Sequence, residues 1–292
     1  MKFICLLAVG LAAGSTAMAQ SLNLGGTSGS APLPIQITAS GGIDWSQKAD
    51  TVTATDNAKA VRGDVTVTAD QLIAHYMPKK AGTATATANA QDDPMGQGST
   101  QLTELDAVGH VHIYTATDNA WGDHAVYTTS QQLLVLTGSN LKLTSPQDTV
   151  TARDSIEYYA ADHKAVARGN AHVTSSDGRT ITADVLIAYF SAQPDKGSST
   201  QPNGNPGGSL EKVDAVGHVV ITTKTDQATG DTGVYIPSTG EARLGGNVHV
   251  THAGNQLAGS DALMNTKTGT ATLLSAPGGQ VSGVILPGSG KN

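Results

Sequence analysis

Short runs in which apolar and polar residues alternate recur along the whole chain. Gly63 is followed by Val65 and Val67, so apolar residues stand two and four positions after the glycine. The same spacing follows Gly109, Gly169, Gly217 and Gly246. A period of two places alternate side chains on opposite faces of a β-strand. The pattern therefore predicts strands whose apolar side chains share one interior.

The predicted inward face comprises the apolar residues at these positions. They are Val65, Val67, Val111, Ile113, Leu141, Leu143, Val173, Val219, Ile221, Val248 and Val250. Gly138 departs from this rule, because Leu141 and Leu143 stand three and five positions after it. This spacing predicts one extra residue in that turn. The alternating polar residues are expected to face solvent, and they include Thr66, Thr68, His110, His112 and His249.

A larger duplication contains these runs. Residues 105–113 (LDAVGHVHI) recur 108 residues later as residues 213–221 (VDAVGHVVI). Between the glycine runs, an aspartate after a small residue leads into another strand. These aspartates are Asp70, Asp123, Asp154, Asp184, Asp231 and Asp261. Because they recur, whereas a catalytic carboxylate would be unique, they are interpreted as capping residues of turns that connect strands.

The repeats predict an elongated all-β structure with little or no helix, because no segment carries an apolar stripe of helical period. Periodicity alone fits either a β-solenoid or a jelly-roll-like pair of antiparallel sheets. The repeated region is expected to span residues 33–287, with mobile loops at 77–100 and 191–209, where Gly, Ser, Ala and Pro are frequent.

The N-terminus has the pattern of a secretory signal peptide over residues 1–19. Lys2 precedes an apolar run, and the small residues Ala17 and Ala19 form the cleavage pattern. Residues 20–32 and 288–292 are expected to be disordered. Cys5 is the one cysteine of the chain and lies within the signal, so the mature protein would have no disulfide and no cysteine metal site.

Composition and motifs exclude several classes of function. The formal net charge is −7 and aromatic residues make up 4% of the chain, which argues against nucleic-acid binding. There is no nucleophile elbow, phosphate loop or dinucleotide fingerprint, so no enzyme activity and no cofactor are expected. No metal site is expected either, because the pairs His110/His112 and His249/His252 have no third ligand at a fixed spacing. A polysaccharide-active enzyme on a β-solenoid is not expected either, because it would need paired carboxylates in one non-repeating unit and the sequence shows none.

Several motifs together carry a family resemblance. In order they are residues 34–37 (PIQI), 42–45 (GIDW), 62–70 (RGDVTVTAD), the two DAVGH copies and residues 151–158 (TARDSIEY). With these motifs the chain resembles the periplasmic lipopolysaccharide-transport protein A family (LptA, or OstA-like), in its longer alphaproteobacterial form. The resemblance covers about residues 33–287, and it implies an elongated antiparallel β-jelly-roll that is open at both ends.

The resemblance also implies a function. Members bridge the inner-membrane-anchored and outer-membrane components of the lipopolysaccharide export machine in the periplasm, join end to end, and carry acyl chains in an apolar interior. Covering ten methylenes is worth roughly 8 kcal/mol. The alternation alone leaves a second interpretation open, a structural or adhesive β-repeat protein whose faces pack shut with no lipid. Candidate docking edges are Ile35 and Ile37 at one end and Val284 and Ile285 at the other, with ordinary frayed strands as the alternative.

Overall fold

The computed structural model describes residues 35–78, 100–191, 210–252, 255–265, 268, 270–276 and 279–284. The predicted signal peptide (1–19), the segments 20–32 and 288–292, Ile285 and most of the two predicted loops lie outside the described residues. The described residues form strands and turns with no helix, as the alternating pattern predicted. Accordingly, no helix in these ranges is long and apolar enough to cross a membrane.

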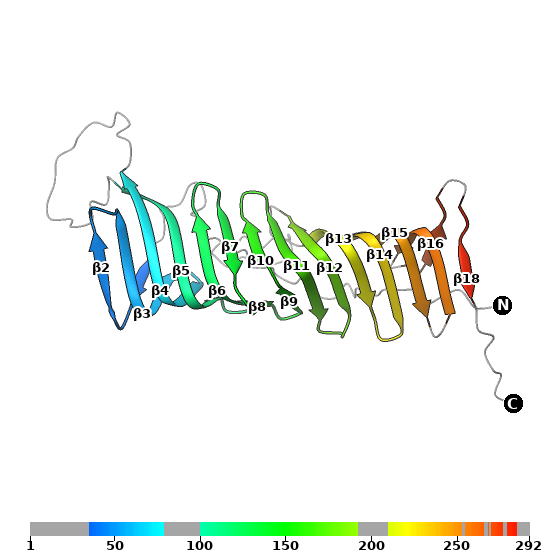
Figure 1. Cartoon of the computed structure of the whole chain (residues 1–292), viewed down its shortest axis with the longest axis horizontal. Helices are drawn as coiled ribbons and strands as arrows, with labels where there is room; N and C mark the ends of the chain where they lie inside the picture. Colours follow the sequence, from blue (N-terminus) through cyan, green and yellow to red (C-terminus); the bar gives the residue numbers. More distant parts are fainter. Residues whose placement is uncertain are drawn as a thin grey trace.

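Eighteen strands form a single hydrogen-bonded antiparallel sheet. They are β1 (Gln36–Thr38), β2 (Gly42–Ser46), β3 (Thr51–Arg62), β4 (Val65–Pro78), β5 (Thr100–Tyr114), β6 (Asn119–Thr128), β7 (Leu133–Thr137), β8 (Leu141–Thr144), β9 (Asp148–Ala152), β10 (Ser155–Tyr159), β11 (Lys164–Ser175), β12 (Thr180–Phe190), β13 (Leu210–Thr222), β14 (Asp226–Ile236), β15 (Glu241–His252), β16 (Asn255–Asn265), β17 (Thr270–Leu274) and β18 (Ser282–Val284). The molecule is elongated, with β1 to β3 at one end and β16 to β18 at the other (Figure 1).

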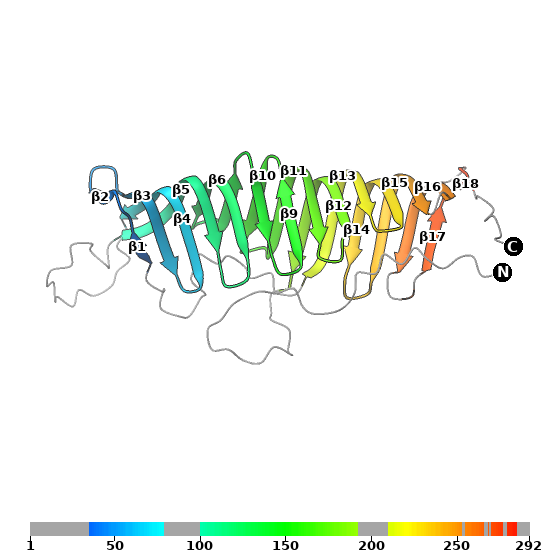
Figure 2. The same cartoon turned by 90° about the horizontal axis from the view of Figure 1, so that it is seen from below.

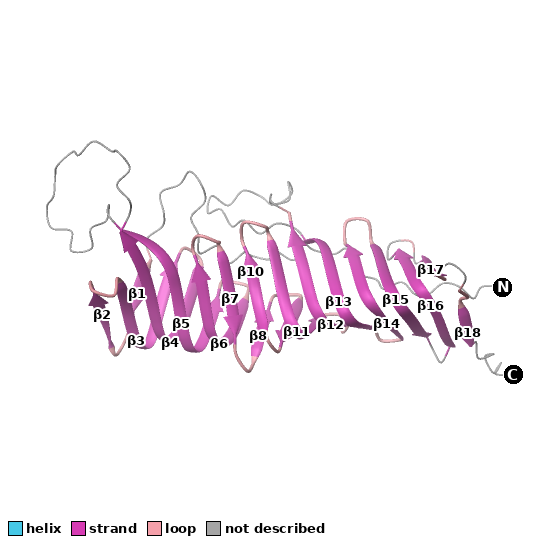
Figure 3. Cartoon of the chain, turned by 45° about the horizontal axis from the view of Figure 1, so that its top comes forward, coloured by secondary structure: helices cyan, strands magenta, loops and turns pink. Residues whose placement is uncertain are grey.

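The sheet is folded into two facing layers because the long strands bend midway. In β4, residues 65–69 pair with the second half of β3, whereas residues 71–75 pair with its first half. We call the two resulting layers layer 1, which contains β1, β8, β9 and β18, and layer 2, which contains β2, β7, β10 and β17. The strands cross the long axis throughout, and the two layers lie one over the other (Figures 2 and 3).

The bends, which we call corners, need an unusual backbone. In β5 the corner is Gly109 and His110, with φ of 77° and 45°. This left-handed region suits glycine and is tolerated by few other residues. A Cβ on Gly109 would lie 2.1 Å from the Asp70 carboxylate of the neighbouring strand. The corner therefore requires glycine in β5 beside aspartate in β4.

The same construction recurs at the corners of β11, β13 and β15. Their residues are Gly169 and Asn170, Gly217 and His218, and Gly246 and Asn247. The expectation that the recurring aspartates cap turns between strands was wrong for five of them, which lie inside continuous strands as the corner glycines do, namely Asp70, Asp123, Asp184, Asp231 and Asp261. Asp154 does lie between two strands, in the two-residue connection from β9 to β10. Gly63 differs, since it does lie in the turn between β3 and β4. The extra residue predicted at Gly138 is confirmed, because three residues separate β7 from β8 there.

Side chains from both layers fill the interior in two apolar clusters. One, towards β1, includes Val111, Ile113 and Leu141, and the other, towards β18, includes Val219 and Val248. Alanine is frequent in both clusters, which allows the layers to approach closely. Ile113 is 1% exposed and Val248 is 0% exposed, so the middle of each cluster is sealed from solvent.

Candidate functional site

The candidate site is the apolar interior between the two layers. Of the predicted inward residues, six belong to the buried clusters, namely Val111, Ile113, Leu141, Val219, Val248 and Val250. The other five pack against the clusters and are partly buried, namely Val65, Val67, Leu143, Val173 and Ile221. All eleven residues therefore face the interior, and their contact with lipid stays a prediction.

These residues all belong to layer 1, and the opposing wall in layer 2 was missed. Its buried apolar residues are Val52, Ala54, Ala74, Ala107, Ala125, Tyr127, Leu134, Leu136, Ile156, Ala167, Leu186, Ala215, Leu244, Ala262 and Met264. The sequence did contain a signal for this wall. Apolar residues stand two and four positions before the corner glycine as well as after it, as Leu105 and Ala107 do before Gly109.

Two cavities lie within the interior. The cavity near β1 measures about 50 Å³ and is lined by residues that include Ile37, Val65, Arg62 and Tyr127. The cavity in the second half of the chain measures about 80 Å³ and includes Ile221 in its lining. By the same measure of volume, a single water needs about 10–15 Å³. Each cavity thus has room for a few water molecules, and the layers are nearly closed on each other.

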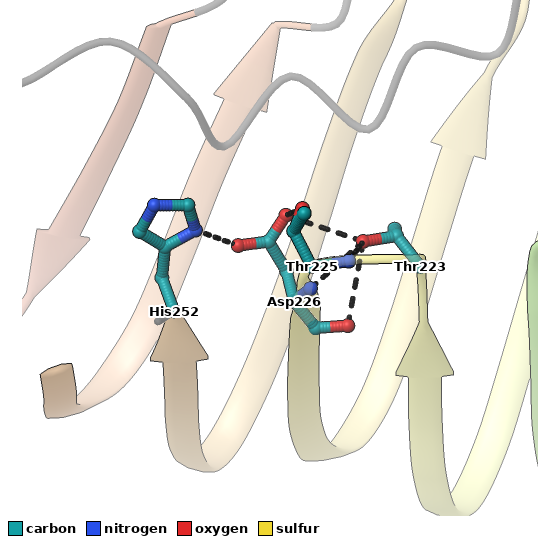
Figure 4. Close-up of polar contacts among 4 residues, drawn as sticks. All are labelled: Thr223, Thr225, Asp226 and His252. Carbon is teal, nitrogen blue, oxygen red and sulfur yellow. Dashed lines mark hydrogen bonds and ion pairs between the residues drawn. The ribbon is translucent and has the colours of Figure 1, made fainter. Parts of the chain in front are cut away.

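Tight polar turns connect the strands of layer 1 along the edge opposite the corners, which we call the mouth. Figure 4 shows the turn between β13 and β14, where the Thr223 hydroxyl oxygen accepts the N–H groups of Thr225 at 3.3 Å and Asp226 at 3.0 Å. The Thr225 hydroxyl donates to the Asp226 carboxylate at 2.7 Å, and His252 of β15 contacts the other carboxylate oxygen. These bonds fix the turn, so this rim of the mouth is locally ordered.

The same turn occurs in the first copy of the duplication. Thr115 accepts the N–H groups of Thr117 and Asp118 at 3.3 and 3.0 Å, and the Thr117 hydroxyl donates to Asp118 at 2.9 Å. Burial raises the pKa of Asp118, although the two threonine hydroxyls act in the opposite direction. The Thr-x-Thr-Asp spacing is visible in the sequence at both places and could have located these turns.

The histidines considered for metal binding are not brought together. His110 lies at a corner, with Nδ1 2.8 Å from Asp70, whereas His112 stacks on Trp121. His249 donates to the backbone oxygen of Asn247 at 2.9 Å. His252 instead contacts Asp226 at the mouth, as described above. Each histidine thus has its own separate partner.

Both ends of the molecule present edge strands. Within the described residues, β1 pairs with β3 alone and β18 with β16 alone, so these strands are the edges of layer 1. Ile37 lies in β1, Ile35 directly precedes it, and Val284 lies in β18. The edges of layer 2 are β2 and β17, which the candidate docking residues did not include.

Exposed apolar side chains accompany these edges. Ile43 and Trp45 of β2 pair with inward-facing residues of β3 but remain 51% and 47% exposed, because no further strand among the described residues covers them. At the opposite end, Val284 of β18 is 61% exposed. Each end therefore offers both unpaired backbone and apolar surface.

Fold and interior together define a class, the elongated antiparallel β-proteins with an apolar space between two layers. A family model described as LptA/(LptD N-terminal domain) LPS transport protein matches residues 36–161 and again residues 154–270. These two matches span most of the chain, and the chain belongs to this family of lipopolysaccharide-transport proteins. The double match agrees with the internal duplication.

One similar solved structure is the crystal structure of LptH from Pseudomonas aeruginosa, described as the LptA-homologous periplasmic component of the lipopolysaccharide transport device. The two chains are 21% identical, and the match covers 48% of this chain and 95% of that one with a TM-score of 0.38. No curated protein sequence matches the chain.

Proposed function

We propose that the protein is a periplasmic carrier that shields the acyl chains of lipopolysaccharide between its two layers. The single observation that carries this proposal is the apolar interior, which runs through both copies of the duplication from the β1 end to the β17 end. Membership of a lipopolysaccharide-transport family supplies the ligand. Transferring each methylene from water into such an interior is favourable by about 0.8 kcal/mol, so a cover of this kind makes transport through water feasible.

The small cavities indicate how lipid would enter. Because the strand ladders run within each layer, the two layers hold to each other mainly through apolar side chains. Separation of the layers at the mouth would leave the backbone ladders intact and would replace side-chain contacts by contacts with acyl chains. In this proposal the corners act as the hinge, and the mouth is the entrance.

In the same proposal, the two ends of the molecule bridge export-machine components at the inner and outer membranes. Edge strands with unpaired N–H and C=O groups recruit further strands. We therefore assign β1 and β2 at one end, and β17 and β18 at the other, to the docking of export-machine components at the inner and outer membranes or of a further copy of this chain. Trp45 and Val284 would be covered in such contacts.

A second candidate function is a structural β-repeat protein whose interior stays packed. The observation in its favour is the size of the two cavities, about 50 and 80 Å³, which leaves no space for an acyl chain in the closed state. The two functions differ in a single respect that can be measured, namely whether lipid reaches the inward residues.

Photo-crosslinking separates these candidates. A benzophenone side chain would be placed at Val65 or Ile221, which line the two cavities. Matched controls place it at the adjacent outward positions Thr66 and Thr222. Irradiation with lipopolysaccharide is expected to give adducts at the two inward positions and few at the controls. Equal adducts at all four positions, or none, would support the packed structural protein instead.

A further inference from the structure

Largely buried carboxylates on the outer face of layer 2 are paired with arginine or lysine. Glu157 accepts a hydrogen bond from Arg168 at 2.8 Å, and Asp214 lies 2.7 Å from the Lys212 ammonium. Asp106 is buried to a similar degree, with its side chain 17% exposed against 20% for Asp214. Its partners, however, are imidazoles. His75 Nε2 lies 3.0 Å from one carboxylate oxygen and His124 Nε2 lies 3.8 Å from the other.

A second carboxylate joins this group. Glu104 of β5 stands directly opposite His75 of β4 in the strand register. One ligand atom from each of His75, Glu104 and Asp106 lies within 4.8 Å of the other two. The cluster thus gathers two acids and an imidazole on adjacent strands, and His124 approaches from β6. All three clustered residues are only partly buried, so the group is open to ions from solvent.

The duplication provides an internal comparison for this cluster. A shift of 108 residues carries Glu104 to Lys212 and Asp106 to Asp214. The residue opposite Lys212 in the register is Tyr189, which takes the place of His75. In this second copy the Lys212 ammonium lies 2.7 Å from Asp214 and 4.5 Å from the centre of the Tyr189 ring.

The second copy therefore supplies its own cation at this position of the fold. The first copy has a carboxylate where that lysine stands and an imidazole where the tyrosine stands. In the second copy Lys212 balances Asp214, whereas in the first copy Glu104 and Asp106 place two carboxylates together. A bound divalent cation would restore the balance.

We propose that His75, Glu104 and Asp106 form a binding site for a divalent transition-metal cation such as Zn²⁺. Imidazole and carboxylate groups are zinc ligands at about 2.0–2.2 Å, and three protein ligands leave a position for water. Because the three ligand atoms already lie within 4.8 Å of one another, the side chains would have to close only a short gap around the ion. The imidazole of His124, on the second oxygen of Asp106, positions that carboxylate.

Such an ion would have a mechanical effect. It would tie β4 to β5 at His75 and Glu104, the last pair before the register between the two strands shifts. This role goes beyond acyl-chain shielding and does not depend on it.

Zinc titration of the untagged, chelator-treated protein by isothermal calorimetry tests the site. We expect one zinc ion per chain and a higher melting temperature with zinc, because the ion binds the folded state. His75→Ala should weaken binding by about tenfold or more. Glu104→Lys, which introduces the residue type of the second copy, should abolish binding and keep the fold, because Lys212 shows that this arrangement is accommodated.

The control variant is Asp214→Asn at the equivalent position of the second copy, which should leave zinc affinity unchanged. His75→Tyr, which also copies the second repeat, provides another variant with an accommodated side chain and should lose binding as well. The proposal is overturned if the parent protein binds no zinc even when zinc is in large excess. It is equally overturned if folded Glu104→Lys and His75→Tyr proteins, as judged by circular dichroism, bind zinc like the parent.

Discussion

Nδ1 of His218 lies 2.8 Å from the Asp184 carboxylate, across the corner at which β13 passes from layer 2 to layer 1. His110 and Asp70 have the same relationship at the corner of β5, also at 2.8 Å. At the corner of β15 an asparagine replaces the histidine, and Asn247 donates to Asp231 at 2.8 Å. One device, a side-chain donor after the glycine and an aspartate on the neighbouring strand, thus shapes corners in both copies.

The first prediction concerns the charge of these histidines. The hydrogen bond with aspartate, together with the carboxylate charge, raises the pKa of both His110 and His218. The pair then stabilises the fold fully below the ordinary histidine pKa of about 6.5, and this contribution is lost as the pH rises through the raised pKa. Because both side chains are exposed, salt should weaken the effect.

NMR titration of the histidine ring protons measures these pKa values directly. In Asp70→Asn the pKa of His110 should fall towards its ordinary value, whereas that of His218 should stay raised, since its own aspartate is intact. A His110 pKa that does not respond to this substitution would show that Asp70 is not its cause.

The second prediction concerns the corner glycines. Gly217→Ala places a Cβ 2.1 Å from the Asp184 carboxylate and forces alanine to φ of 78°. We expect a loss of about 1–3 kcal/mol in the free energy of unfolding, measured with urea. Gly178→Ala is the matched control, because its φ is 87° but the nearest atom would be 4.0 Å away. Equal losses in the two variants would mean that the backbone angle alone matters and the close aspartate does not.

The third prediction concerns Tyr127, whose ring is buried in the interior. Its hydroxyl has no hydrogen-bond partner within the described part of the chain, and burial raises its pKa. A buried polar group without a partner costs about 1–3 kcal/mol. Tyr127→Phe should therefore raise the melting temperature of the lipid-free protein. A lower melting temperature would show that the hydroxyl makes a favourable contact.

The fourth prediction concerns Glu157 on the outer face. Burial raises the pKa of Glu157, but hydrogen bonds from Arg168, Ser155 and Tyr159 outweigh burial and lower the pKa overall. The bonds therefore stabilise the fold above the ordinary glutamate pKa, and that contribution is lost as the pH falls through the lowered value. Arg168→Ala should destabilise the protein at neutral pH and flatten this acid dependence. Unfolding curves collected across acidic pH would reveal an unchanged dependence if Arg168 were unimportant.

Local alternation predicted part of this structure well. The side chains of Val111 and Val219 face inward because the two-residue period continues without a break after each corner glycine. The alternation of apolar and polar residues could not distinguish a corner within a strand from a turn between strands. Gly63 and Gly109 have the same apolar spacing after them, yet one ends a strand and the other bends one. Pairing with a distant strand decides between these outcomes, and the sequence does not encode that pairing locally.

The polar clusters were missed for a related reason. Asp106 meets His75 across two strands, and the two residues are 31 positions apart in sequence. Glu104 stands opposite His75 only through the register of β4 and β5, which is regular from Gln71 to His75 and which the sequence does not encode locally. The search for metal ligands in the sequence relied on a fixed spacing along the chain, and such a spacing does not detect ligands that come together from different strands.

The central claim, that the interior opens at the mouth to admit acyl chains, is tested most directly by a distance across one bent strand. Thr117 and Ser130 are exposed in the turns at the two ends of β6, one on each rim of the mouth. The only cysteine is Cys5 in the predicted signal, so cysteines at these two positions would carry spin labels specifically. Labels at Thr117 and Thr225, which share one rim, provide the control.

Electron–electron double resonance would then measure both distances with and without lipopolysaccharide. If acyl chains enter between the layers, the Thr117–Ser130 distance increases on lipid binding while the Thr117–Thr225 distance changes little. A bound state with an unchanged Thr117–Ser130 distance would contradict entry of acyl chains between the layers.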